Sequence, residues 1–260
     1  MLSKQKIVRS ILKFTNRSRG IRWWLKDESL IPAARYVAEA VRDIAKSAMP
    51  AGIEMLKLNE RKAVFRFWHP QKTESSFVVK AFFFKPIERC LKYHKYGLDE
   101  TANLLTARDK GVSVPEVYGY GHINNVLGIP KVSMIILEDF QSCSHIGVLM
   151  RSKSESECSK MLMQTVPLFV SLYKASCNHI DVNSGAVMLC KGNFNHSVFL
   201  LDFQYAKFYD KPSNEILMFE AGYFARHCSA WVSTETISKW REELFAAVGS
   251  NNTADEAEKK

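Results

Sequence analysis

The segment from His179 to Leu189 reads HIDVNSGAVML and carries the strongest indication of the fold class. It places one carboxylate, Asp181, in a polar loop that contains a glycine. The apolar run that begins at Phe199 then ends in a second carboxylate, Asp202. Enzymes that transfer phosphoryl groups use two carboxylates in this way, because one orients the acceptor hydroxyl and the other binds a metal ion.

A lysine and a glutamate that precede this segment are further candidate catalytic residues. Lys80 lies within the apolar run Phe77–Phe84, where a lysine is unfavourable unless an anion or carboxylate meets it. A helical pattern from Leu98 carries Glu100 in its first turns, a position that otherwise only favours helix initiation. The alternative for Lys80 is the exposed face of a strand. The order lysine, glutamate, H-x-D and D-F is the order of the catalytic groups in kinases.

Composition and charge narrow the class of protein. The chain has 260 residues, of which 47% are apolar and 24% charged, as in an ordinary globular protein. Its net charge of +9 favours an anionic partner such as a nucleotide, a nucleic acid or an acidic membrane surface. Nucleic acid would explain the charge but not the carboxylates, so we do not expect it. Six cysteines without a C-x-x-C pair predict reduced, mostly buried thiols.

The hydrophobic pattern predicts an α+β fold. β-rich runs at Ile53–Leu58, Ala63–Trp68 and Ser76–Phe84 predict an antiparallel meander. A long helix is expected at Ser154–Ser176, with a kink at Pro167. These patterns predict two lobes with a ligand cleft between them. The expected parts are a basic N-terminal helical extension at 1–50, a β-rich N-lobe with one key helix at 51–138, a mostly helical C-lobe at 139–248 and a disordered tail at 249–260.

The N-terminal segment is strongly basic. It has eight Lys/Arg residues and no acid between Met1 and Lys26, in an amphipathic helical pattern followed by a tryptophan pair. Such a segment can lie on an anionic membrane, and it can equally be an arm packed on the domain. A mitochondrial presequence has a similar composition, and the sequence leaves that alternative open. No apolar run is long enough to cross a bilayer. The candidate contacts with a membrane or an anionic substrate are Arg22, Trp23, Trp24, Lys85, Arg89 and Lys92.

The ordered set of residues resembles the protein-kinase-like superfamily. More narrowly, the chain is similar to the lipopolysaccharide core kinases, which phosphorylate 3-deoxy-octulosonic acid (Kdo) or heptose in Gram-negative bacteria. The resemblance covers about Ile53 to Phe208. It is carried by Phe77–Phe84, Asp99–Tyr120, Leu172–Leu189 and Val198–Phe208.

This resemblance implies an ATP- and Mg²⁺-dependent sugar kinase at the cytoplasmic face of the inner membrane, with an anionic glycolipid (lipid A–core) as acceptor. It leaves the oligomeric state open. Lys80 would grip the α- and β-phosphates while Glu100 holds it, and backbone groups around Glu138 would meet the adenine. Asp202 would bind Mg²⁺. Asp181 would be the catalytic base, and His179 would have a structural role in the loop.

Three features depart from the kinase pattern. One is the short stretch from Phe203 to Val248, which has no Ala-Pro-Glu signature and argues against an ordinary protein kinase. The turn Asn59-Glu60-Arg61-Lys62 replaces a glycine-rich loop, and Ala186 stands seven residues after His179, where kinases have an asparagine metal ligand. Asn183 is the candidate substitute for that ligand, or one metal held by Asp202 suffices. Two other functions therefore stay open. One is a pseudokinase or nucleotide-binding module, and the other is a small-molecule phosphotransferase of the aminoglycoside- or choline-kinase type.

Overall fold

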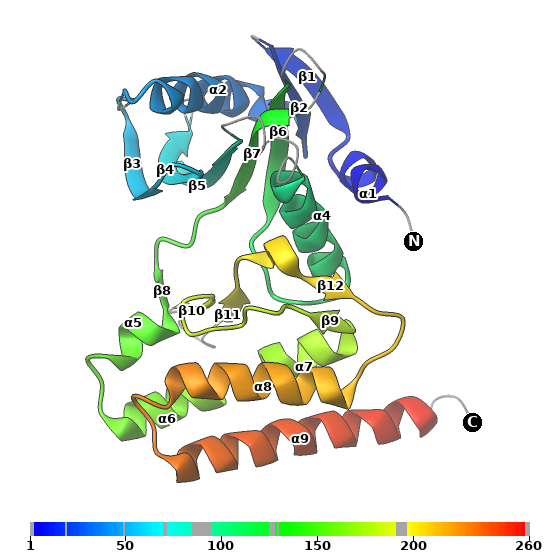
Figure 1. Cartoon of the computed structure of the whole chain (residues 1–260). Helices are drawn as coiled ribbons and strands as arrows, with labels where there is room; N and C mark the ends of the chain where they lie inside the picture. The colour runs from blue at the N-terminus through cyan, green and yellow to red at the C-terminus, as the bar shows by residue number, and fades with distance from the viewer. Residues whose placement is uncertain are drawn as a thin grey trace. The chain divides into compact units, whose positions relative to one another are not determined.

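A computed structural model describes residues 3–18, 20–48, 50–69, 72–84, 95–124, 128, 130–190 and 197–257. The chain divides into two compact units (Figure 1). The first comprises residues 1–106 and 115–139, and the second comprises residues 107–114 and 140–260. The N-terminal 50 residues thus belong to the first unit and do not form a separate extension.

The first unit is built on a seven-stranded antiparallel sheet. The expected meander is present as three neighbouring strands, and the sheet order is β1-β2-β6-β7-β5-β4-β3. The strand bounds are β1 Phe14–Ser18, β2 Ile21–Leu25, β3 Ile53–Leu58, β4 Lys62–His69, β5 Lys72–Phe83, β6 Val117–Asn124 and β7 Pro130–Glu138.

Side-chain alternation gives this sheet two different faces. Helix α2 (Ile31–Ala45), which follows the short helix η1 (Glu28–Leu30), packs its alanines and valines on one face, against Val79 and Ala81 of β5. Because successive side chains of a strand point to opposite faces, Lys80 lies on the face away from α2. The buried cluster on the α2 side comprises, among others, Trp23, Val37, Phe65, Phe67 and Ile136.

The N-terminal segment differs from its expected form after the first helix. Helix α1 (Lys4–Ile11) is present, but residues 14–25 form β1 and β2 and extend the sheet by two strands. The physical reason is a two-residue period, since Ile21, Trp23 and Leu25 are buried while Arg22 is exposed. Trp23 is 0% and Trp24 is 3% exposed, so both rings pack within the first unit, and a contact of this pair with a membrane stays a prediction.

Helix α4 (Tyr96–Asp109) approaches the sheet closely at its start. Gly97 lies against Ser133 of β7, and a Cβ atom at Gly97 would collide with that side chain. The hydroxyl of Thr101 donates to the Gly97 carbonyl at 2.7 Å. This close approach brings the first turns of α4, and therefore Glu100, onto the sheet.

The second unit is mostly helical, with small sheets. Its strands form a three-stranded sheet of order β11-β10-β8 and a two-stranded sheet of β12 and β9. The helix bounds are α5 Ile146–Met150, α6 Glu155–Met163, α7 Val166–Lys174, η2 Phe203–Tyr205, α8 Asn214–Cys228 and α9 Thr234–Ala257. The strand bounds are β8 Cys143–His145, β9 Cys177–Asn178, β10 Val187–Cys190, β11 Ser197–Leu200 and β12 Lys207–Phe208.

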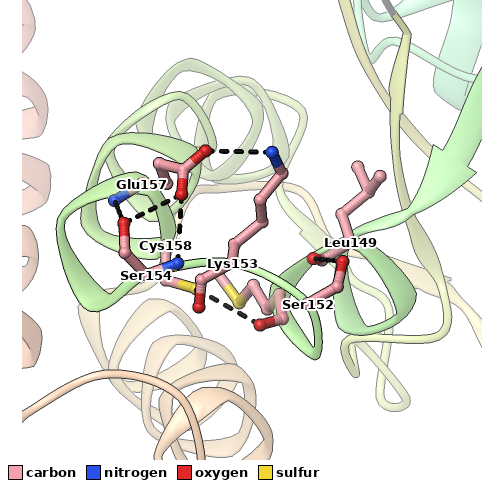
Figure 2. A network of polar contacts seen from close by, with 7 residues as sticks. Leu149, Ser152, Lys153, Ser154, Glu157 and Cys158 are labelled. Carbon is pink, nitrogen blue, oxygen red and sulfur yellow. Dashed lines mark hydrogen bonds and ion pairs between the residues drawn. The ribbon is translucent and has the colours of Figure 1, made fainter.

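Helix α6 begins at a capping box (Figure 2). Glu157 accepts hydrogen bonds from Ser154 N at 3.1 Å and from Lys153 Nζ at 2.9 Å, while Glu157 N donates to Ser154 Oγ. These donors lower the pKa of Glu157 to about 2. The expected long helix is divided into α6 and α7 instead of kinked, because Pro167 occupies the first turn of α7.

Three aromatic rings form the core of the helical unit. The ring centroids of Phe169 and Phe224 lie 5.2 Å apart, and Trp240 meets both at 5.2 and 5.8 Å. Trp240 Nε1 donates to Thr165 Oγ1 at 3.1 Å. Trp240 anchors α9, which continues to Ala257 through the segment expected to be a disordered tail.

Two cysteines differ from the expected reduced state. Cys143 of β8 and Cys190 of β10 are directly opposite in the sheet register and form a disulfide. Cys158, Cys177 and Cys228 are free and buried, as expected. Cys90 lies outside the described residues. Among the described helices, none combines the length and apolar character that a membrane span requires.

Candidate active site

Lys80 and Glu100 form a buried ion pair. Lys80 lies in the middle of the sheet, where β5 pairs with β4 and β7, and its Nζ is 2.6 Å from Glu100 Oε1. The residues are 7% and 0% exposed. The expected pairing is therefore confirmed, and the exposed-strand alternative for Lys80 is wrong. Glu100 Oε2 is buried and accepts no hydrogen bond from the described residues, so the carboxylate is held by the lysine.

The end of β7 carries two carboxylates with different partners. Glu138 Oε2 accepts from Glu116 N at 3.0 Å, which joins the ends of β6 and β7. Asp139 accepts from Arg66 Nε at 2.5 Å and from Ser76 Oγ at 2.6 Å, and its side chain is 2% exposed. Both side chains thus fix the end of the sheet. A contact of the Glu138 backbone with adenine stays a prediction.

An asparagine closes the turn at the position of a kinase glycine-rich loop. Asn59 Oδ1 accepts from the backbone N–H groups of Arg61 and Lys62, both at 2.9 Å. Side-chain oxygens of asparagine stabilise tight turns in this way. The β3–β4 connection is therefore a short hairpin turn, and it contains no glycine.

Asp181 lies exposed in a loop whose side chains orient it. Asn183 Nδ2 donates to Asp181 Oδ1 at 2.8 Å, and Tyr223 Oη of α8 donates to the same oxygen at 3.0 Å. Asn183 Oδ1 accepts from Gly185 N at 2.8 Å. Asn183 therefore uses both ends of its amide to shape the loop around Asp181.

His179 joins this loop to the residue before Asp202. It is fully buried, and its Nε2 donates to the Leu201 carbonyl at 2.8 Å. Its ring meets Phe203 edge to face, with ring centroids 4.7 Å apart. The two carboxylate-bearing segments are thus braced through one imidazole, which is the structural role expected for His179.

Glu220 of α8 contacts the backbone of the loop that contains Asp181. It is 1% exposed and accepts a hydrogen bond from the backbone N–H of His179, while the nearby N–H of Ile180 donates to Asn178 Oδ1 at 3.0 Å. Ile180 has φ of 73°, a conformation that a β-branched residue adopts only under constraint. Burial raises the pKa of Glu220 to about 7, although the backbone N–H groups of His179 and Ile180 act in the opposite direction.

Asp202 ends the segment in a left-handed backbone conformation, with φ of 61° and ψ of 50°. Asp tolerates this region better than most residues, and such outliers often occur at functional sites. The residue is exposed. No group of three or more His, Cys, Asp or Glu side chains in the described part of the chain could hold a metal ion by itself. Asp202 nevertheless suits Mg²⁺, which commonly binds one or two carboxylates together with substrate phosphates and waters.

Ala186 occupies a buried position. It is 2% exposed, its N–H donates to the Asn183 carbonyl at 3.0 Å, and its carbonyl accepts from Leu201 N at 2.9 Å. A methyl group here binds no metal, and it packs the loop against the strand that leads to Asp202. A second protein ligand for Mg²⁺ at this place is therefore absent.

Sequence reasoning missed Glu220 and Tyr223. Both lie on α8, and a signal for Glu220 was present, because it falls on the helix stripe of Leu217, Ala221 and Phe224, which are otherwise apolar and buried. No pattern marked Tyr223, which contacts Asp181 across 42 positions. The predicted contacts Lys85, Arg89 and Lys92 lie outside the described residues.

The antiparallel sheet with its buried lysine–glutamate pair and the helical unit with its H-x-D loop define a kinase-like α+β fold. Among solved structures, the chain is similar to WaaP, in a structure of its complex with acyl carrier protein. The TM-score is 0.52, and the match covers 74% of this chain and 78% of that chain. At 11% identity this likeness shows the fold alone. No protein-family model and no curated protein matches the sequence.

Proposed function

We propose that this protein is an ATP-dependent kinase that phosphorylates a sugar, Kdo or heptose, of the lipopolysaccharide inner core at the cytoplasmic face of the inner membrane. The observation that carries the proposal is the ion pair of Lys80 and Glu100, buried in a kinase-like fold. A buried lysine held by a carboxylate is a preformed site for phosphate oxygens. The likeness to WaaP supports the kinase-like fold, and the choice of acceptor rests on the resemblance of the sequence motifs to the lipopolysaccharide core kinases.

Each residue has a distinct part in the proposed reaction. Lys80 binds the α- and β-phosphates, and Asp202 holds Mg²⁺ on the nucleotide, where the ion supplies positive charge to the developing transition state. Asp181 accepts the proton of the sugar hydroxyl. The oxygen of this hydroxyl attacks the γ-phosphorus, and ADP leaves. Convergence of Lys80 with Asp181 and Asp202 on one nucleotide site is part of this proposal.

A short connection from Asp202 to the next helix favours a small acceptor over a protein. The segment runs through η2 and β12 and reaches α8 at Asn214. Protein kinases need an activation loop between the corresponding positions to bind peptide substrates. The chain offers no room for one, so we propose a glycolipid acceptor.

The test is phosphate transfer from γ-labelled ATP to purified lipid A–core acceptor in the presence of Mg²⁺. We expect transfer that is abolished in Asp181→Ala and retained in Glu243→Gln, which removes an exposed carboxylate of α9 outside the site. An aminoglycoside and choline serve as competing acceptors. Transfer to one of these instead of the glycolipid would reassign the acceptor, and full activity of Asp181→Ala would reject the assigned base.

Buried Ala186 favours one second candidate, a pseudokinase that binds nucleotide without transferring phosphate. Its methyl group replaces a metal ligand and packs in the core. Thermal-shift titration with ATP, with and without Mg²⁺, distinguishes the two functions. A kinase should be stabilised more strongly by ATP when Mg²⁺ is present. Equal stabilisation by ATP with and without Mg²⁺, together with no phosphate transfer, would favour the pseudokinase.

A further inference from the structure

A pocket of about 280 Å³ lies within the first unit, apart from the residues assigned to phosphoryl transfer. We call it the Arg9–Arg22 pocket. Its basic groups are Arg9, Arg22 and Lys95, and its aromatic walls are Trp24, Tyr120 and His122. The sequence indicates Arg22 and Trp24 as candidate anion contacts, but it does not reveal the pocket, because the other residues come from α1, β6 and the segment just before α4.

The sheet alternation explains how the pocket forms. Arg22 and Trp24 of β2 lie on the face away from α2, next to Tyr120 and His122 of β6, which pair with them in register. The rings of Trp24 and Tyr120 are stacked with centroids 5.8 Å apart. Helix α1 covers this face through Val8, which is 1% exposed, and the next residue of that helix is Arg9.

Positive charge is concentrated around one ring of the pocket. The guanidinium carbons of Arg9 and Arg22 lie 5.7 and 5.3 Å from the centroid of Trp24. Within the described part of the chain, neither guanidinium is paired with a carboxylate. The nearby acid Asp99 is bound by Lys4 at 3.3 Å. The pocket therefore carries a local excess of positive charge that an anion would neutralise.

His122, which lines the pocket, has a ring nitrogen that lacks a hydrogen-bond partner within the described ranges of the chain. Its Nδ1 is buried and has no hydrogen-bond partner in the described residues. Burial and the charges of Arg22 and Arg9 lower the pKa of His122 to about 4, so the ring is neutral near pH 7. A buried polar atom without a hydrogen-bond partner is unfavourable, and a ligand that supplies this partner would remove the energetic cost.

We propose that the Arg9–Arg22 pocket binds a small phosphate monoester, with Arg9, Arg22 and Lys95 around the phosphate and Trp24 and Tyr120 against its organic part. Three cationic groups match the double negative charge of a phosphate monoester better than the single charge of a carboxylate. Guanidinium groups bind phosphate oxygens through paired, charge-assisted hydrogen bonds. The volume is at the lower end of ligand pockets, which limits the bound part to a small molecule or one headgroup.

This inference is independent of the proposed phosphotransfer, because the pocket contains none of the groups assigned to that reaction. Its phosphate has two possible sources, a soluble phosphate ester or the headgroup of a membrane lipid. The probes are glycerol 3-phosphate for the first source and phosphatidylcholine vesicles with and without phosphatidic acid for the second.

The test is calorimetric titration of the full chain with glycerol 3-phosphate at constant ionic strength, alongside vesicle co-sedimentation. We expect saturable binding of one of the two probes, weakened at least about tenfold by Arg22→Gln and by Arg9→Gln, because each loses a charge-assisted bond. Arg35→Gln is the matched control, since it removes an exposed guanidinium of α2 on the other face of the sheet.

Two variants on different elements keep the test decisive if one of them misfolds by circular dichroism. Binding of glycerol 3-phosphate alone assigns a soluble ligand, and binding only to vesicles that contain phosphatidic acid assigns a lipid headgroup. Absence of saturable binding to both probes would overturn the proposal. Equal affinities of the wild type, Arg22→Gln and Arg9→Gln would also overturn it, because the anion would then bind elsewhere.

Discussion

The hydroxyl of Tyr223 donates a hydrogen bond of 3.0 Å to Oδ1 of Asp181, and this bond ties helix α8 to the loop of the proposed base. Asn183 Nδ2 donates to the same oxygen at 2.8 Å. The second oxygen, Oδ2, accepts no hydrogen bond from the described residues. One carboxylate oxygen is therefore fixed by two donors while the other is left to accept the proton of a substrate hydroxyl.

Substitution Tyr223→Phe should lower kcat without changing the KM for ATP. The variant keeps the ring but removes one of the two donors to Asp181, and a single hydrogen bond of this kind corresponds to about a fivefold effect. Steady-state phosphorylation of lipid A–core is the measurement. Tyr209→Phe is the control, because Tyr209 is an exposed tyrosine of the same unit. An unchanged kcat in Tyr223→Phe would show that the bond does not position the base.

Substitution Lys80→Met should destabilise the first unit as well as abolish nucleotide binding. It leaves the Glu100 carboxylate buried without its cation, and Glu100 Oε2 already lacks a partner in the described residues. Breaking a buried ion pair from one side typically costs about 3–5 kcal/mol. Urea unfolding followed by circular dichroism measures the loss.

The double variant Lys80→Met, Glu100→Gln separates stability from function. Removing both charges should restore most of the free energy of unfolding, while ATP binding stays lost. If Lys80→Met alone unfolds at the same urea concentration as the wild type, the pair does not carry a buried charge in solution.

Much of the sheet and the ion pair could be predicted because both rest on local patterns. The alternation in β4 and β5 specifies strands, and a lysine in such a strand demands a carboxylate partner, here Glu100. The segment from Phe14 to Leu25 was misassigned because its basic residues hide a short two-residue period. Whether that period extends the central sheet depends on pairing with β6, which lies nearly 100 positions away.

Contacts that depend on tertiary register were beyond sequence reasoning. The disulfide of Cys143 and Cys190 joins residues 47 positions apart, and it requires β8 and β10 to pair with these two residues opposite each other. The loop supports Glu220 and Tyr223 depend on how α8 packs under the segment that contains Asp181. Spacing along the chain carries no information on such packing.

Substitution Ala186→Asn tests whether the missing metal ligand can be restored. The position is buried, and the larger polar side chain has to be accommodated between the loop and the strand before Asp202. Overpacking of this kind costs about 1–3 kcal/mol. We therefore expect a lower free energy of unfolding and no gain in kcat. Val187→Ile, a buried apolar enlargement at the next position, is the control for volume alone. A rise in kcat at higher Mg²⁺ concentration in Ala186→Asn would show instead that the site accepts the ligand.

Substitution Glu220→Gln should change how stability depends on pH. The folded protein raises the pKa of Glu220 to about 7 from its usual 4.5, so between these values the folded state keeps a proton that the unfolded chain has lost. Stability must therefore fall as the pH rises from 4.5 to 7, by on the order of 3 kcal/mol for this group. The introduced glutamine keeps an oxygen that can accept from the His179 N–H but does not ionise. Chemical unfolding at several pH values should show that the free energy of unfolding of Glu220→Gln rises relative to that of the wild type between pH 4.5 and 7. Glu215→Gln, which removes an exposed carboxylate of the same helix, should show no such relative rise. A difference between Glu220→Gln and the wild type that is constant with pH would mean that Glu220 is ionised throughout, and that the nearby backbone N–H groups outweigh its burial.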